Sequence, residues 1–576
     1  MAQSTSLNIV DNIVMGKESP IDDNINIGEL ILKAFKIKPD FVGQVDAITE
    51  EENTFQQMRK RSVKCALWLK KIGVQRNDIV TVCTFNHLDA YIPYLASLYI
   101  GAILSVWPDE HIGNLRYFIQ SCPKVIFTDI DKAPTIHNVA KIMNVSTKIV
   151  VFKKECEEEE RFESLNSILN NDFDEDEIDK FSCTKLESSK DTAVILFSSG
   201  SIDYLRKHVT IPHSFFISPS NQHVPIMIPN NVGIWLDSLH WNIGLLLTIR
   251  CILSYVKAIK VYKDIKTIAT SQVSLSDSIQ KYQVKVKCFI LLLKMYKLKK
   301  FLDSYFLLQV NWLFLKSDAL KYFNFNIFKS CNMPSFKQLL FTCTTIPIIF
   351  MPRIADALPK TSIIVAYCLP ETGIITIHRF DKIKRDLISY MAKNVSLFFA
   401  DFNTELPLNE GKLGYIRCNT PCLTNGYFDS STRNIVSAID KNGWFHTEEI
   451  GTYTKENIHI FERGVTGHVI TYKNYRFSPI ELEKLLRTHP AVRYVVVVPV
   501  FHPFDTHHPM ALIIRKENVE VTKKEIIEYV AARVDDRKQL RAGVLFMDDL
   551  PSLYTGVFDR KQIFYETKKF LATKQI

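Results

Sequence analysis

Short apolar runs alternate with helical patterns through the first part of the chain. Compact runs of β-forming residues are found at Asp78–Cys83, Lys124–Thr128 and Lys148–Phe152. Elsewhere, the spacing of apolar positions predicts helices over Glu50–Leu69 and Ala90–Gly101, the second of which ends at a glycine. Strands that alternate with helices are typical of a parallel, doubly wound sheet. The pattern therefore predicts an α/β fold.

The α/β alternation continues to about Phe380, and the pattern then changes. A β-rich section opens at Gly411–Arg417, and the pairs Asn425-Gly426 and Asn442-Gly443 indicate turns within it. Together these patterns predict one large domain over residues 1–463, built from doubly wound sheets and a β-rich subdomain.

The C-terminal part of the chain has a pattern of its own. It predicts a helix over Ser478–Arg487, strands over Tyr494–Val500 and Met510–Arg515, and a helix over Thr522–Val534. We expect residues 464–576 to form a small α+β domain, joined to the large domain by a hinge.

The composition limits the kinds of partner. At 576 residues, with 47% hydrophobic and 23% charged residues, the chain is typical of soluble proteins with more than one domain. The basic stretch Lys285–Lys300 is also apolar, which favours an amphipathic helix packed on a domain over a nucleic-acid or membrane-surface helix. We expect no nucleic-acid partner. The acidic stretches Glu155–Glu160 and Asp172–Asp179 are predicted to be solvated loops.

Cysteine spacing and apolar runs bear on the compartment. None of the twelve cysteines forms a C-x-x-C pair, and the nearest two are Cys418 and Cys422, so we expect no zinc and a reducing compartment. The apolar stretch Leu239–Val256 is interrupted by Asn242 and Arg250, so no run reaches the roughly 20 residues of a membrane span. With no leader pattern and no Ser-Lys-Leu ending, a cytoplasmic protein is expected rather than a peroxisomal one.

One segment carries candidate phosphate chemistry. The apolar run Val194–Phe197 is followed by small hydroxyl residues around a glycine and then by basic residues, at Ser198, Ser199, Gly200, Ser201, Arg206 and Lys207. Small side chains let backbone N–H groups approach an anion, hydroxyls add donors, and a basic side chain supplies charge. The segment predicts a strand that leads into a phosphate-binding loop. Taken alone, it is also compatible with an ordinary serine-glycine turn.

Further motifs follow in order along the chain. They are Tyr367-Cys-Leu-Pro-Glu371, Gly443-Trp-Phe-His-Thr-Glu-Glu-Ile450, Glu462-Arg463, Ser478-Pro-Ile-Glu481 and Leu550-Pro-Ser-Leu-Tyr-Thr-Gly556. With the serine-rich loop, they resemble the motifs of the AMP-forming adenylate synthetases, which include acyl-CoA synthetases, coumarate-CoA ligases and beetle luciferases. The resemblance runs from about residue 41 to residue 565 and is greatest to the insect luciferase-like and coumarate-ligase-like branch.

The resemblance implies a two-step reaction. A carboxylate, from a fatty or an aromatic acid, attacks the α-phosphate of Mg-ATP, and a thiol, usually that of coenzyme A, then displaces AMP. The implied nucleotide contacts are Ser198, Ser199, Gly200, Ser201, Arg206, Lys207, Tyr367, Glu371, Glu449 and Arg463. Among these, Glu371 is implied to support Mg²⁺ and Glu449 to hold the ribose hydroxyls, while His240 lies where the family lines its acyl pocket. The alternatives are scaffold roles, such as a core histidine at His240 and a polar turn around Glu449.

The chain departs from the family pattern at positions that carry the chemistry. Val557 stands where the family has the lysine that bridges carboxylate and phosphate oxygens, and losing such a group costs about a hundred- to a thousand-fold in rate. In the phosphate loop, Ile202 replaces a threonine and Asp203 a glycine. The other replacements are Thr344–Pro347 at the adenine platform, Cys368 and Pro370 beside Glu371, Glu449 for an aspartate, and Val465 at the hinge.

These departures favour an acyl-CoA synthetase-like protein with little or no adenylation activity. One alternative is a working carboxylate-CoA ligase that recruits a different lysine. Another is a non-catalytic lipid-binding module that uses the acyl tunnel.

Overall fold

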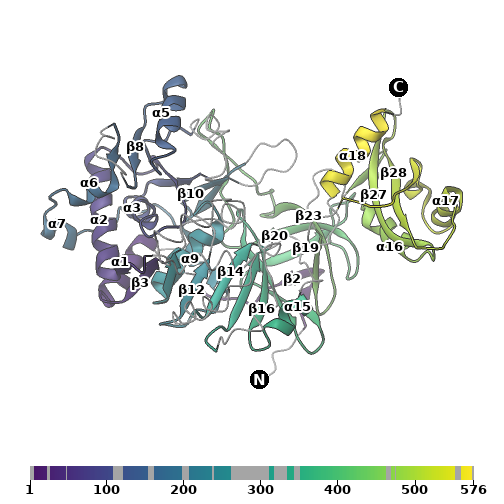
Figure 1. Cartoon of the computed structure of the whole chain (residues 1–576), viewed down its shortest axis with the longest axis horizontal. Helices are drawn as coiled ribbons and strands as arrows, with labels where there is room; N and C mark the ends of the chain where they lie inside the picture. The colour runs from purple at the N-terminus through teal and green to yellow at the C-terminus, as the bar shows by residue number, and fades with distance from the viewer. Residues whose placement is uncertain are drawn as a thin grey trace, which may run out of the picture.

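The structure is a computed structural model (Figure 1). It describes residues 6–21, 26–46, 49–107, 121–153, 161–197, 207–222, 224–235, 239–260, 310–316, 334–342, 351–461, 469–473, 475–551 and 560–573. The basic stretch Lys285–Lys300 and the whole acidic stretch Glu155–Glu160 lie outside these residues.

The first nine-stranded sheet contains the strands on either side of the predicted phosphate loop. Its order is β22-β21-β11-β10-β6-β5-β7-β8-β9. The bounds are β5 (Ile79–Cys83), β6 (Ile103–Val106), β7 (Val125–Thr128), β8 (Lys148–Val151), β9 (Glu163–Ser164), β10 (Thr192–Phe197), β11 (His208–Pro212), β21 (Gly426–Phe428) and β22 (Ile435–Val436). The strands from β10 to β9 run parallel, whereas β11 pairs antiparallel with β10. The strands predicted near residues 78, 124 and 148 are confirmed.

The second nine-stranded sheet has the order β18-β17-β16-β15-β14-β12-β13-β3-β4. Its strands are β3 (Val42–Asp46), β4 (Glu52–Thr54), β12 (Val232–Trp235), β13 (Lys257–Lys260), β14 (Trp312–Lys316), β15 (Gln338–Thr342), β16 (Ser362–Leu369), β17 (Gly373–Asp381) and β18 (Asp386–Met391). Neighbouring strands from β16 to β3 are parallel, and both edges are antiparallel. The α/β prediction is therefore confirmed, although the alternation ends at β16, before Phe380.

Helices pack against and between these sheets. They are α1 (Ile27–Ile37), α2 (Phe55–Lys71), α3 (Tyr91–Ile100), α5 (Ala133–Ile142), α6 (Leu165–Asn170), α7 (Glu175–Asp179), α8 (Ser214–Ile217), α9 (Asn242–Leu253) and α15 (Met351–Ala357). All of α3 and nearly all of α9 is buried, as expected of central helices that are apolar all round. The Tyr94 hydroxyl donates to the Leu245 carbonyl at 3.3 Å, which joins these two helices. Among the described residues, no helix is both long and apolar enough to cross a bilayer.

The ends of two helices show how local chemistry sets their limits. Helix α2 begins at Phe55, because Glu52–Thr54 belong to β4 and the Thr54 side chain then caps the helix in a capping box with Gln57. The predicted start near Glu50 was therefore too early. Helix α3 ends at Gly101, whose φ of +70° is the left-handed conformation that favours glycine, as predicted.

The second acidic stretch is not simply a solvated loop. Asp174 caps the short helix α7, and the acidic first turn suits the positive end of a helix. Two α7 carboxylates pair with basic residues of α2: Glu175 with Lys60 at 2.5 Å and Asp179 with Arg59 at 2.9 Å. The loop prediction was wrong for Glu175–Asp179, which form a helix, whereas the carboxylates of the stretch are exposed to solvent as predicted.

The β-rich part is a six-stranded antiparallel sheet of order β1-β2-β19-β20-β23-β24. Its strands are β1 (Asn8–Val10), β2 (Ile13–Met15), β19 (Ser396–Ala400), β20 (Gly414–Asn419), β23 (Phe445–Tyr453) and β24 (Ile458–Phe461). The β-rich subdomain is confirmed, but it includes two strands from the N-terminal end that the sequence pattern did not indicate. Since β24 ends at Phe461 and residues 462–468 are not described, the domain boundary at 463 stays a prediction.

The C-terminal part forms a separate small sheet beside the six-stranded one (Figure 1). Its elements are β25 (Ile470–Tyr472), β26 (Tyr475–Phe477), α16 (Pro479–Arg487), β27 (Val492–His502), β28 (Thr506–Arg515), α17 (Lys523–Ala531), β29 (Gly543–Phe546) and α18 (Arg560–Thr573). The predicted helices and strands are confirmed, and β27 and β28 extend further, into one long hairpin. Asn403 of the large domain exchanges hydrogen bonds of 2.8 and 3.2 Å with the Arg476 backbone, which is a contact between the two parts.

Candidate functional site

Two of the described site residues lie at the carboxyl end of a parallel strand: Tyr367 is near the end of β16 and Glu371 follows shortly after it. Strand β10 ends at Phe197, immediately before the predicted phosphate loop, and Lys207 is the first described residue after that loop. Ligands of open α/β sheets bind at this edge. Outside the described residues lie Ser198, Ser199, Gly200, Ser201, Arg206 and Arg463, and also the altered positions Ile202, Asp203, Thr344–Pro347, Val465 and Val557.

Lys207 and Glu371 are linked through a tyrosine. The Lys207 ammonium lies 4.8 Å from the centre of the Tyr427 ring, and the Tyr427 hydroxyl donates to a Glu371 carboxylate oxygen at 3.4 Å. Glu371 is buried in the turn between β16 and β17, where its carbonyl accepts from the Thr424 N–H at 2.7 Å. The structure thus connects the basic residue after the loop with the carboxylate implied to support Mg²⁺. Tyr427 was not predicted as a site residue, although it directly follows the predicted turn at Asn425-Gly426.

Tyr367 and Glu449 also come together, from different sheets. Tyr367 lies on β16 and Glu449 on β23, and both are buried, with 0% and 1% of their surface exposed. Burial raises the pKa of Tyr367 well above its ordinary value, and the neighbouring Glu449 carboxylate raises it further. Thr447 accepts from the Glu449 N–H at 3.1 Å, which fixes the backbone of β23 at this point. The carboxylate implied to hold ribose therefore lies beside the motif tyrosine.

His240 lies at the same edge, directly before α9. The Asn242 side chain donates to the Leu369 carbonyl at 3.2 Å, so the start of α9 lies against the carboxyl end of β16. The role of His240 in the implied acyl pocket stays a prediction. A cavity of about 420 Å³ is lined by Met227, Arg250, Leu253 and neighbouring residues. It lies at the other end of α9, roughly 15 Å along the helix, so it is separate from His240.

A buried lysine that no sequence motif indicated joins the two large sheets. The Lys260 ammonium, at the carboxyl end of β13, donates to the Asn86 side-chain oxygen at 2.8 Å and lies 4.4 Å from the centre of the Trp235 ring. Asn86 in turn donates to the Trp235 carbonyl at 3.3 Å. Burial lowers the pKa of Lys260 to about 7. The sequence feature that could have indicated Lys260 is a lysine at the end of an otherwise buried strand.

A second buried polar cluster follows β5 and β7. Thr84 donates to Asp129 at 2.7 Å and lies 3.0 Å from the His87 ring nitrogen, and Lys132 pairs with Asp129 at 3.0 Å. Burial raises the pKa of Asp129 to about 6 and lowers that of His87 to about 4. The cluster is satisfied internally, which makes it a structural support of this edge.

The architecture is that of adenylate-forming enzymes, with two large sheets, an antiparallel sheet and a small C-terminal domain. The chain belongs to the AMP-binding enzyme family, whose profile matches residues 36–428. Residues 481–556 match the C-terminal domain of AMP-binding enzymes. The resemblance inferred from the sequence motifs is therefore confirmed.

Curated relatives span almost the whole chain. Luciferin 4-monooxygenase of Photinus pyralis is 25% identical over 94% of each chain. Probable 4-coumarate-CoA ligase 2 of Dictyostelium discoideum is 24% identical over 93% of this chain and 94% of its own.

Solved structures agree on the fold. A red-emitting luciferase from Phrixothrix hirtus superposes with a TM-score of 0.72 at 22% identity, covering 97% of this chain and 99% of its own. A fatty acyl CoA synthetase of Mycobacterium tuberculosis does so with a TM-score of 0.70 at 16% identity, covering 95% and 99%. At these identities the likeness establishes the fold.

Proposed function

We propose that this chain is an acyl-CoA synthetase-like protein that keeps a nucleotide pocket but has lost most or all of its adenylation activity. The observation that carries the proposal is Val557, at the position of the family's catalytic lysine. Removing one preorganised positive group from a site where negative charge develops lowers the rate about a hundred- to a thousand-fold. The altered loop residues Ile202 and Asp203 act in the same direction.

One half of the pocket fits a nucleoside. We call Tyr367 and Glu449 the adenosine end. An aromatic ring offers a face to a base, and a carboxylate accepts from both hydroxyls of a ribose. In this chain the two groups are adjacent and shielded from water, which strengthens polar contacts made there.

The other half of the pocket fits the magnesium-bound phosphate groups of ATP less completely. We call Lys207, Tyr427 and Glu371 the phosphate end. Glu371 supplies one carboxylate, which suits an ion that commonly takes one or two together with phosphate oxygens. Mg-ATP, when bound, supplies the activated phosphate, and Lys207 contributes positive charge beside the loop. Val557, which stands at the position of the family's lysine, adds no positive charge.

The runner-up function is a working ligase that recruits another lysine. Its supporting observation is Lys207, which remains on the phosphate side of the pocket at the face of Tyr427. Lys260 is the poorer candidate, because it is 2% exposed and already bonded to Asn86.

The test is ATP–pyrophosphate exchange with a panel of fatty and aromatic acids, using the full chain. We expect exchange at background level with every acid. Mg-ATP, AMP and a long-chain fatty acid are titrated in parallel against thermal stability, because a ligand selective for the folded state raises it. A shift with nucleotide but no exchange supports the proposal, whereas robust exchange with any acid overturns it. A shift with the fatty acid alone points to a lipid-binding module.

A further inference from the structure

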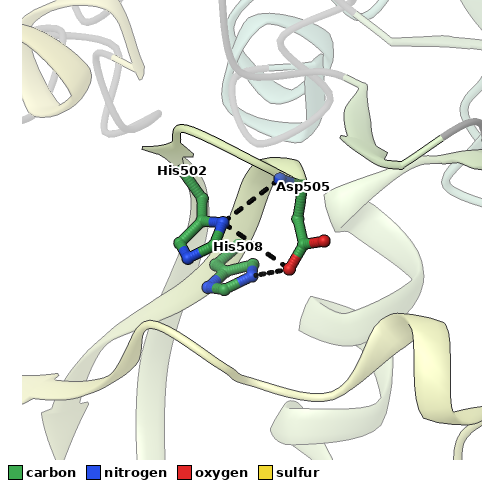
Figure 2. Close-up of side chains that lie close together, drawn as sticks. All are labelled: His502, Asp505 and His508. Carbon is green, nitrogen blue, oxygen red and sulfur yellow. Dashed lines mark hydrogen bonds and ion pairs between the residues drawn. The ribbon is translucent and has the colours of Figure 1, made fainter.

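Three metal-ligating side chains gather at the tip of the long hairpin in the C-terminal domain (Figure 2). Strand β27 ends at His502, Asp505 lies in the turn, and His508 lies on β28. In the register of the hairpin, His502 is opposite Thr506 and Val500 is opposite His508. Because cross-strand partners share a face and side chains alternate, both histidines lie on the same face.

One ligand atom of each side chain lies close to those of the other two. The Asp505 Oδ2 atom lies 2.9 Å from His508 Nε2 and 3.5 Å from His502 Nδ1. The three ligand atoms all lie within 4.8 Å of one another. The two imidazole rings are stacked, with centres 4.0 Å apart and planes at 19°. In Figure 2 both rings and the carboxylate point into the same space.

We propose that His502, Asp505 and His508 bind a divalent transition-metal ion, with Zn²⁺ as the best match. Zinc takes imidazole nitrogen and carboxylate oxygen at about 2.0–2.2 Å, so neighbouring ligand atoms of a tetrahedral zinc lie about 3.3 Å apart. The two distances to Asp505 bracket this value. The side chains are 35%, 19% and 17% exposed, so a water molecule can complete the fourth position.

The surrounding contacts show what the ion replaces and what it stabilises. The Asp505 N–H donates to His502 Nδ1 at 3.2 Å, and a metal at this nitrogen takes the place of that bond. The Lys473 N–H donates to the Asp505 carbonyl at 2.8 Å, which ties the turn to the end of β25. An ion at the turn therefore holds the hairpin tip in place relative to β25. The expectation of no zinc rested on cysteine spacing, and this site uses none.

One charged neighbour opposes the ion. The Lys473 ammonium lies 4.0 Å from Asp505 Oδ1, the carboxylate oxygen that faces away from His508. Its positive charge repels a cation and competes for the carboxylate. Removing this charge with Lys473→Ala should therefore tighten metal binding, which is a change that simple damage to the hairpin does not produce.

The experiment uses the full chain, stripped with a chelator and titrated with Zn²⁺ by calorimetry. His502→Ala and His508→Ala are each expected to weaken Zn²⁺ binding by about tenfold or more. Loss of a residue that only hydrogen-bonds to a metal ligand already weakens metal binding by about that much. His507→Ala is the matched control: His507 is opposite Phe501 on the other face of the hairpin, and the variant should bind as the unmodified chain does. Far-UV circular dichroism without metal establishes that each variant is folded.

A second readout reports which kinds of ligand atom bind the metal. Co²⁺ bound to two imidazoles and a carboxylate gives visible d–d bands without the near-ultraviolet thiolate band of a cysteine site. Bands of this kind, lost in His502→Ala, support the proposal. It is overturned by a thiolate band, by Zn²⁺ affinity that is unchanged in both histidine variants, or by the absence of binding up to about 1 mM Zn²⁺.

Discussion

The adenosine end and the phosphate end of the pocket are held by different means. Tyr367 and Glu449 lie on strands of two sheets and are almost fully buried, so they contribute to the contact between those sheets. Lys207 and Tyr427 are only partly buried, and Lys207 follows directly on the altered loop. Residues that also support packing are costly to replace, because a buried site loses stability as well as function. Residues that serve chemistry alone change at little cost to the fold.

On the function proposed here, this difference would let a chain keep nucleotide recognition while it loses catalysis. The departures from the family pattern include Val557, the loop and the hinge. On the adenosine side they include Thr344–Pro347 at the adenine platform and Glu449 in place of an aspartate, but Tyr367 and a carboxylate at position 449 remain. The predictions below test the separation between the two ends, beginning with the largest expected effect.

Val557→Lys should not restore normal adenylation. Ile202 still lacks the hydroxyl of the family's threonine, and Asp203 still places a negative charge where the family has glycine, so we expect the phosphates to be poorly held. We expect ATP–pyrophosphate exchange to stay about 100-fold or more below that of an active coumarate-CoA ligase measured alongside. Val557→Met is the control of similar length without charge. Turnover close to that of the active ligase would show that the loop matters little.

Glu449→Gln should weaken AMP binding by about tenfold to a hundredfold. The substitution keeps the shape of the side chain but removes the charge that strengthens its hydrogen bonds to ribose hydroxyls, worth about 1.5–3 kcal/mol. The measurement is AMP affinity from ligand-induced thermal shifts. His446→Ala is the matched control, since His446 lies on the same strand, is 45% exposed and bonds to Asp440. Equal losses in the two variants would argue against a ribose contact at Glu449.

Lys260→Met should leave AMP binding unchanged but flatten the pH dependence of stability. Burial lowers the pKa of Lys260 to about 7 from its usual 10.5, so between these values the unfolded chain holds a proton that the folded chain has released. The contribution of Lys260 to the free energy of unfolding therefore rises with pH above 7, by up to about 1.4 kcal/mol per pH unit. Urea unfolding at pH 7 and pH 9 should show this gain in the unmodified chain and a smaller one in the variant. Loss of AMP binding in a folded variant would instead place Lys260 in the pocket.

Tyr427→Phe should have the smallest effect. It removes the hydroxyl that donates to Glu371 at 3.4 Å but keeps the ring that faces Lys207. A hydrogen bond of this length contributes about 0.5 kcal/mol, or roughly twofold in Mg-ATP affinity, measured by titration. AMP affinity should not change, because AMP lacks the phosphates that reach Glu371. A large loss of AMP binding would show that the two ends are not separate.

Much of the fold was predictable from the chain because its signals are local. The apolar runs of β5, β7 and β8, the glycine after α3 and the serine before α16 each specify an element within a few residues. The N-terminal strands were missed because β2 pairs with β19, which lies at Ser396–Ala400, and a three-residue strand has no periodicity to detect. Helix α7 was missed because ion pairs with α2, which is distant in sequence, stabilise its acidic residues.

The candidate site was predictable only where a motif covers it. Family motifs identified Tyr367, Glu371 and Glu449, and the structure brings Tyr367 to Glu449 and Glu371 to Lys207 through Tyr427. Lys260 could not be found in this way, because its partners Asn86 and Trp235 come from two sheets and only the fold unites them.

Nucleotide binding without adenylation is tested most directly by titrating AMP into the full chain and measuring the heat of binding. We expect one AMP bound per chain, with affinity weakened in Glu449→Gln, and no pyrophosphate formed from Mg-ATP with any acid. No detectable binding at about 1 mM AMP would contradict the proposal, because Tyr367 and Glu449 would then have only a structural role.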